Sequence, residues 1–202
     1  MDAIDNLILS SIYVSSLDGS EPLAAARKSM IPEDMLQERM ASLASRGAIE
    51  NNALTELGRS SLRVVFAGGV FDIIHPGHIH TLNAAKKLGD ILVVTVATDS
   101  TVKKMKKHAP LHTQEQRKDL VSSLHMVDLC LVGDERDMFR TVEKVRPDVI
   151  ALGYDQVHQE KYVTDGCSKL GLSIAVARLQ SPVPEISSST IEKEYGEAIH
   201  DT

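Results

Sequence analysis

The chain has 202 residues, of which 43% are hydrophobic and 25% are charged, so it is long enough for one large or two small domains with a packed core. Trp is absent and aromatic residues make up 3%, which leaves aliphatic side chains and Met to build the core, as is common in α/β proteins with parallel sheets. The formal net charge of -6 argues against wholesale nucleic-acid binding, which normally needs a basic face.

We expect neither an export signal nor a membrane-spanning segment in this sequence. Its acidic start, Met-Asp-Ala-Ile-Asp, lacks the basic flank and apolar core of a signal peptide, and no apolar run approaches the length of a membrane span. Cys130 and Cys167 lie in apolar or helical stretches without a C-x-x-C spacing, so we expect buried thiols. We therefore expect a cytoplasmic protein without membrane contact.

Residues 1–61 are patterned as a small helical domain that ends in an extended segment. The expected elements are an apolar segment over residues 7–14, a helix over 22–30, a helix from 31 to 47, and a hairpin over 48–58 with an Asn-Asn turn. Gly47 fits the stop signal of the third helix.

Three helices followed by a hairpin resemble a winged helix-turn-helix domain. In DNA-binding members the third helix should present basic and amide side chains to a groove. Here it carries Glu33, Asp34 and Glu38 against Arg39 and Arg46. We therefore favour a scaffold or dimerisation role, with a homodimer as the default assembly. Nucleic-acid binding through this domain, as in a ligand-sensing DNA-binding regulator, is the alternative of a different class.

Residues 62–202 are predicted to form an α/β domain, because apolar runs alternate with helical stretches. The runs lie at 63–67, 91–97, 128–132, 149–153 and 173–177, and the helical stretches at about 79–88, 113–124, 136–146 and 160–170. This alternation predicts a doubly wound, Rossmann-like parallel sheet with helices on both faces. The strand ends at Gly68, Thr98-Asp99, Gly133 and Gly153 should converge on one crevice.

A glycine pair and two histidines follow the first of these runs, in Gly-Gly-Val-Phe-Asp-Ile-Ile-His-Pro-Gly-His at 68–78. Gly68 and Gly69 let the backbone turn sharply and a ligand come close. Pro76 suits the first turn of a helix, whose free N–H groups favour anions. His75 and His78 share one face of that turn, and Gly77 keeps it free of bulk. The pattern predicts a phosphate site.

Two other interpretations of this segment stay open. His75 could simply cap the helix while His78 is polar surface, since short motifs are hypotheses. A metal site from His75, His78 and Asp72 is the second, because imidazole and carboxylate can ligate zinc or iron. The metal site lacks an evident fourth ligand and leaves the glycines unexplained. His80 lies elsewhere on the helix by the 3.6-residue period.

The run at 68–78 resembles the G-x-F-D-x-x-H-x-G-H signature of the cytidylyltransferase-like nucleotidyltransferases, and the similarity extends over about residues 62–195. The resemblance implies transfer of a nucleotidyl group from a nucleoside triphosphate, bound with Mg²⁺ or another divalent cation, to a small phosphorylated acceptor. His75 and His78 would be catalytic and would stabilise the α-phosphoryl group. The loop Gly68, Gly69, Val70, Phe71 and Gly77 would bind the nucleotide.

Further roles are implied for residues beyond this loop. Lys103 or Lys104, in a run of four lysines within five positions, would contact the phosphates, and Arg117 would hold the substrate phosphate. A solvated turn and an exposed helical arginine are the alternatives. Gly153, Tyr154 and Asp155 would lie beside the nucleotide, and Ser188 would donate to a phosphate from the start of the last helix.

Three segments resemble the archaeal-type FAD synthases, which implies ATP and FMN as substrates: the Phe-Asp-Ile-x-His-Pro-Gly-His form, Thr-Val-Lys-Lys at 101–104, and Gly-Tyr-Asp-Gln at 153–156. Glycerol-phosphate cytidylyltransferases typically read Arg-Thr-x-Gly-Ile-Ser near the last helix, where this chain has Pro182-Val183-Pro184-Glu185-Ile186-Ser187. This departure weakens transfer of their specificity. A CTP-dependent cytidylyltransferase acting on glycerol 3-phosphate or a similar headgroup phosphate stays as the alternative.

Overall fold

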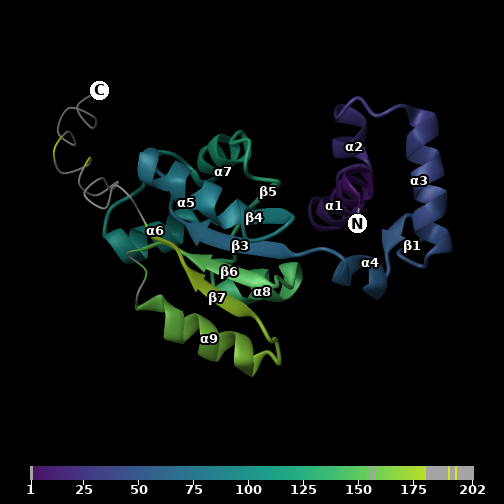
Figure 1. The fold of residues 1–202 in the computed structure, drawn as a ribbon. Helices are drawn as coiled ribbons and strands as arrows, with labels where there is room; N and C mark the ends of the chain where they lie inside the picture. The colour runs from purple at the N-terminus through teal and green to yellow at the C-terminus, as the bar shows by residue number, and fades with distance from the viewer. Residues whose placement is uncertain (1, 155, 157, 181–190, 192–193, 195–202) are drawn as a thin grey trace.

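The computed structural model describes residues 2–154, 156, 158–180, 191 and 194 (Figure 1). The first elements are α1 (Ala3–Asp18), α2 (Ala24–Lys28), α3 (Glu33–Ser45), β1 (Ile49–Glu50), β2 (Ala53–Leu54) and α4 (Glu56–Ser60). β1 and β2 pair antiparallel, and Asn51 and Asn52 between them have φ of 51° and 60°. Two successive positive φ values are what a two-residue type I′ hairpin turn requires. The predicted helices, hairpin and Asn-Asn turn are confirmed.

An α/β part follows, in which strands and helices alternate. Its elements are β3 (Val64–Gly69), α5 (Pro76–Lys86), β4 (Ile91–Val96), α6 (Asp99–Lys106), α7 (Gln114–Ser122), β5 (Leu129–Val132), α8 (Met138–Val145), β6 (Val149–Leu152), α9 (Gln159–Lys169) and β7 (Ala175–Arg178). Within the described residues these strands form a parallel five-stranded sheet in the order β5-β4-β3-β6-β7. The chain winds outward from β3 in both directions, so the predicted doubly wound sheet is confirmed.

Each face of the sheet is covered by helices, because successive strand residues point to opposite sides. Val65 and Ala67 of β3 belong to a core with Leu82 of α5 and Val121 of α7. Val64 and Phe66 belong to a second core with Val142 of α8 and Val163 of α9. In Figure 1 helices α5 and α7 lie on one side of the sheet and α8 and α9 on the other. All six residues of β4 are buried, as expected for a strand covered on both faces.

The N-terminal elements pack against the end of the sheet where its strands begin (Figure 1). Ile8 and Leu9 of α1 belong to the same core cluster as Val64 and Phe66 of β3. Tyr13 Oη donates a hydrogen bond of 2.7 Å to the carbonyl oxygen of Val145, the last residue of α8. Residues 2–61 and the sheet therefore share one continuous core, and this part of the chain lies at the far end of the sheet from its carboxyl edge.

The lysine run lies on a helix that the sequence pattern did not predict. Helix α6 begins after Thr98, whose hydroxyl accepts from the N–H of Thr101 as an N-cap. Lys103, Lys104 and Lys106 occupy its last turn, where cations stabilise the negative end of the helix dipole. Val102 is its buried residue in the structure, so eight residues offered too little apolar periodicity to distinguish a helix from a polar turn.

Several smaller expectations can be compared with the structure. Cys130 and Cys167 are buried free thiols, as predicted, and burial raises the pKa of Cys130 to about 12. None of the helices in the described ranges combines the length and apolar character needed to cross a bilayer. The predicted last helix with Ser188, and Asp155 in the loop after β6, lie outside the described residues.

Candidate active site

The sheet has a topological switch point between β3 and β6, which are hydrogen-bonded neighbours although two strands separate them in the chain. In doubly wound sheets ligands bind beyond the carboxyl ends of the strands at such a point. The loop after Gly69 and the loop that begins with Gly153 and Tyr154 leave the sheet at this edge. The Gly153 loop is closed by the side-chain oxygen of Gln156, which accepts from the N–H of Gly153 at 2.8 Å. Gly133 follows the last residue of β5, at the same edge but farther from the switch point.

His75 and His78 lie together at the start of α5. His75 is the N-cap residue in extended backbone, and Pro76 occupies the first helical turn. The two imidazole rings are tilted by 37° with centroids 3.9 Å apart, as their three-residue spacing predicts, whereas His80 is exposed. Two imidazoles are therefore held at a helix N-terminus, where the helix dipole favours negative charge, an arrangement suited to a phosphate.

The environment of His78 disfavours its charged form. Its pKa is lowered to about 4, first by burial and then by the nearby charges of His75 and Lys106, while a main-chain contact with Ile73 acts in the opposite direction. His78 is therefore neutral at pH 7 in the free protein. A phosphate placed beside it would favour the protonated form, because an opposite charge at short range raises the pKa of a histidine.

The depressed pKa of His78 predicts a specific pH dependence. The ¹H NMR signals of His78 should titrate with a midpoint near pH 4, well below the ordinary value of about 6.5. Between these values the unfolded chain binds a proton at residue 78 that the folded chain does not. The contribution of neutral His78 to the free energy of unfolding is therefore fully present above pH 6.5 and is lost as the pH falls through 4. In urea denaturation, His78→Asn should lose less unfolding free energy between pH 7 and 4.5 than the wild type. A wild-type midpoint near 6.5 would contradict the burial.

Phe71 has φ of 53°, which bulky side chains rarely adopt. Its buried ring lies 5.1 Å from the His78 ring, centroid to centroid. A Cβ on Gly69 would lie 2.8 Å from the Phe71 ring, so the absence of a side chain there makes room for this packing. Strained backbone of this kind persists only where its surroundings enforce it, and it occurs preferentially at functional sites.

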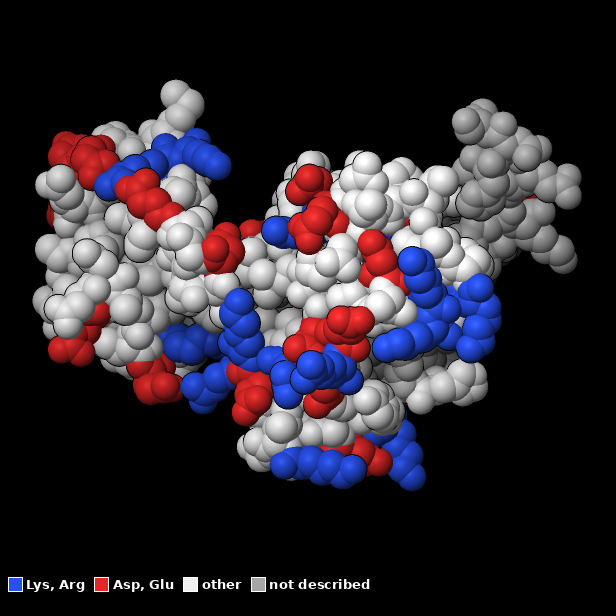
Figure 2. Space-filling model, turned by 180° about the vertical axis from the view of Figure 1, so that it is seen from behind, with Lys and Arg blue, Asp and Glu red and all other residues white. Residues whose placement is uncertain are grey.

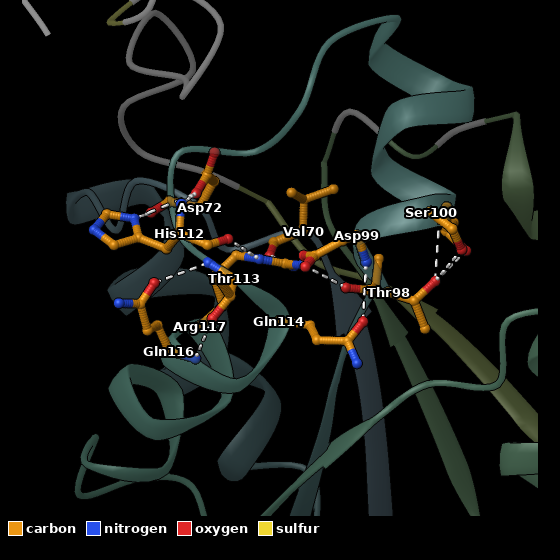
Figure 3. A network of polar contacts seen from close by, with 12 residues as sticks. Val70, Asp72, Thr98, Asp99, Ser100, His112, Thr113, Gln114, Gln116 and Arg117 are labelled. Atoms are coloured by element: carbon orange, nitrogen blue, oxygen red, sulfur yellow. Dashed lines mark hydrogen bonds and ion pairs between the residues drawn. The ribbon is translucent and has the colours of Figure 1, made fainter. Parts of the chain in front are cut away.

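Asp72 binds a neighbouring loop. Its carboxylate oxygens accept from the N–H groups of Leu111 and His112 at 2.7 and 2.8 Å, and His112 Nδ1 lies 2.9 Å from the Asp72 carbonyl oxygen (Figure 3). The side chain is 3% exposed. The alternative of a metal site from His75, His78 and Asp72 is therefore not what the structure forms, because the carboxylate is already occupied by main-chain donors. Sequence spacing could not reveal partners about forty residues away.

Arg117 differs most from its expected setting. The sequence prediction placed its guanidinium on a substrate phosphate, but the side chain is 0% exposed and bound to protein oxygens on three sides (Figure 3). Nε donates to the His112 carbonyl at 3.0 Å, and Nη1 donates to the Val70 carbonyl at 2.7 Å. Nη2 donates to the Ala97 carbonyl at 2.7 Å and to Asp99 Oδ1 at 2.8 Å. Arg117 thus links the loops after β3 and β4 from within the fold.

Lys106, and not the predicted Lys103 or Lys104, is the lysine whose charge lowers the pKa of His78. Lys103 and Lys104 are exposed, whereas Lys106 is half-buried and its charge contributes to the low pKa of His78. Figure 2 shows Lys and Arg side chains gathered at the end of the molecule beside the grey residues, where α6 lies in Figure 1. Lys106 follows Lys103 by three positions, so the helical period would have grouped them had α6 been predicted.

Comparison with known proteins identifies the class of protein to which this fold and this site belong. A family model described as "Cytidylyltransferase-like" matches residues 66–194, more than half of the chain. The chain belongs to this cytidylyltransferase-like family and is a nucleotidyltransferase.

More specific relatives are FAD synthases. That of Aciduliprofundum boonei is 51% identical over 116 residues, which cover 57% of this chain and 77% of that protein. The FAD synthase of Picrophilus torridus is 48% identical over 126 residues, which cover 62% of this chain and 90% of that protein. A crystal structure described as the lipopolysaccharide core biosynthesis protein from Thermoplasma volcanium is 44% identical, with a TM-score of 0.57 and coverage of 59% of this chain and 98% of that one.

Proposed function

We propose that this nucleotidyltransferase joins the adenylyl group of ATP to FMN, which forms FAD and pyrophosphate. The observation that carries this proposal is the 51% identity to an FAD synthase over a segment that makes up 77% of that enzyme. The site geometry supports it, because the histidine pair and the lysine-bearing helix α6 lie at the edge where doubly wound sheets bind nucleotides.

The reaction needs alignment and charge neutralisation rather than an enzyme nucleophile. A phosphate oxygen of FMN attacks the α-phosphorus of ATP, the bond from the α-phosphorus to the bridging oxygen breaks, and pyrophosphate leaves. The imidazoles of His75 and His78 at the start of α5 would donate to the α-phosphoryl oxygens. Lys106, with Lys103 and Lys104 on the same helical turn, would neutralise the outer phosphates.

A divalent cation, Mg²⁺ in the simplest case, would fit this site as part of the nucleotide complex. The two carboxylates described nearby, Asp72 and Asp99, already accept from protein N–H groups. In the described ranges no three His, Cys, Asp or Glu side chains gather as a metal site. Magnesium commonly uses substrate phosphates and water as ligands, so the triphosphate would bring the ion, which would offset charge on the leaving pyrophosphate.

The substrate pair can be tested by measuring pyrophosphate release with ATP or CTP against FMN, glycerol 3-phosphate and phosphocholine. We expect release with ATP and FMN together, with FAD as the fluorescent product resolved by chromatography. Matched reactions that lack FMN or the enzyme give the background. Release with CTP and glycerol 3-phosphate alone would overturn the flavin assignment and support the cytidylyltransferase alternative.

The charges of the N-terminal part favour a scaffold role over DNA binding. Arg27, Arg39 and Arg46 each form ion pairs with carboxylates of the same part of the chain, namely Glu21, Glu33, Asp2 and Asp5. A groove-binding surface instead needs cations available to phosphates. The winged-helix assignment, the division at residue 61 and the homodimer stay predictions.

A further inference from the structure

We propose that Arg117 is a positioning residue for nucleotidyl transfer: it holds the peptide that sets Phe71 against His78 and ties that loop to helix α6. The proposal rests on the transferase activity of the family, and its kinetic arm uses the ATP and FMN assigned above. The role differs from the phosphate contact expected from the sequence, because Arg117 would act through other residues.

Burying the guanidinium of Arg117 costs desolvation free energy. Arg117 is the largest fully buried side chain among those described, and Asp99, its ionic partner, is 34% exposed. The desolvation cost of a buried charged pair offsets most of the Coulomb attraction between its two members. Such a pair is therefore weak evidence for a stabilising role. The planar donors of arginine do, however, fix the directions of the oxygens they bind.

Arg117 is linked to the histidines through Val70 and Phe71. Nη1 binds the Val70 carbonyl, and this carbonyl shares one rigid peptide plane with the N–H of Phe71. Holding that plane restrains φ of Phe71 at its unfavourable value of 53°. The Phe71 ring in turn packs on His78, which is half-buried and whose pKa is lowered in part by the charge of Lys106.

Arg117 also binds the start of α6, the lysine-bearing helix of the site. Nη2 binds the Ala97 carbonyl and Asp99, which flank Thr98, the N-cap of α6. The same guanidinium therefore fixes both the loop that leads to the histidine pair and the start of the lysine-bearing helix. Because these groups must act on one triphosphate, their mutual placement is what Arg117 controls.

The test compares Arg117→Lys with a matched control, Arg59→Lys. Arg59 also donates to main-chain carbonyls, those of Leu62 and Arg146, but at the amino end of the sheet. For Arg117→Lys we expect kcat per folded protein to fall at least about tenfold, with KM for ATP changed less than about threefold. The NMR titration midpoint of His78 should rise from near 4 toward 6.5 as its packing relaxes. Arg59→Lys should lose stability and keep both values.

A milder variant, Asp99→Asn, keeps the main-chain bonds of Arg117 and removes its ionic partner. For Asp99→Asn we expect kcat to fall about threefold and the titration midpoint of His78 to rise. This variant can therefore test the proposal if Arg117→Lys does not fold. The proposal would be overturned if a folded Arg117→Lys or Asp99→Asn protein kept the wild-type kcat and the wild-type titration midpoint of His78. It would also be overturned by a raised KM for ATP with unchanged kcat, which is the signature of direct phosphate binding. Wild-type protein inactive on FMN would count against the flavin assignment alone, because the His78 midpoint needs no substrate.

Discussion

His78→Asn is expected to lower kcat/KM for ATP and FMN by about 10²- to 10³-fold while the protein stays folded. The estimate is the usual cost of removing one donor that stabilises charge in a transition state. The replaced side chain lies beside His75, with ring centroids 3.9 Å apart, at the N-terminus of α5. Steady-state pyrophosphate release measures the loss.

The matched control for this prediction is His80→Asn. His80 lies on the same helix, two residues on, and is exposed. Its replacement should change kcat/KM by less than about twofold, since surface substitutions away from a site have small effects. Equal losses in both variants would point to damage of α5 as a whole, and an unchanged His78→Asn would remove the histidine pair from the mechanism.

Leu9→Ala in α1 is expected to destabilise the whole protein by about 2–5 kcal/mol, the usual cost of truncating a fully buried leucine. Leu9 is 0% exposed and shares a core cluster with Val64 and Phe66 of β3. Urea unfolding followed by circular dichroism should therefore show one transition at lower denaturant, and transferase activity should be lost at the same midpoint.

Leu57→Ala provides the comparison within the same part of the chain. Leu57 is 56% exposed, so its truncation should change the unfolding free energy by less than about 0.5 kcal/mol. Two separate transitions for Leu9→Ala, with the sheet unaffected by the first, would show that residues 2–61 fold independently. That outcome would support the division at residue 61 and contradict the shared core.

The family model and the matches to relatives each cover only part of this chain. The 136 residues matched in the FAD synthase of Thermoplasma volcanium make up 95% of that protein and 67% of this chain. The family model begins at residue 66. Residues 2–61 meet the α/β part at the amino end of the sheet, where Tyr13 Oη donates to the carbonyl oxygen of Val145.

The doubly wound sheet was predictable because its signals are local. Apolar runs separated by helical stretches specify parallel strands with crossover helices, and the glycine pair and Pro76 mark where β3 ends and α5 begins. The facing histidines follow from the helical period alone. The Asn51-Asn52 turn was equally local, since asparagine tolerates left-handed backbone.

By itself, then, the sequence determined the order of the strands and of the helices other than α6, the glycine-containing loop at the end of β3, and the family to which the chain belongs. The tertiary structure alone decided that Arg117 binds the Val70 carbonyl of the loop, that Asp72 holds Leu111 and His112, and that the charge of Lys106 acts on His78. The physical reason is that burial, and the choice of a partner for a buried charge, depend on segments that meet only in the folded chain. The spacing of residues along a helix determines which side chains share a face, but not which other segments of the chain that face contacts.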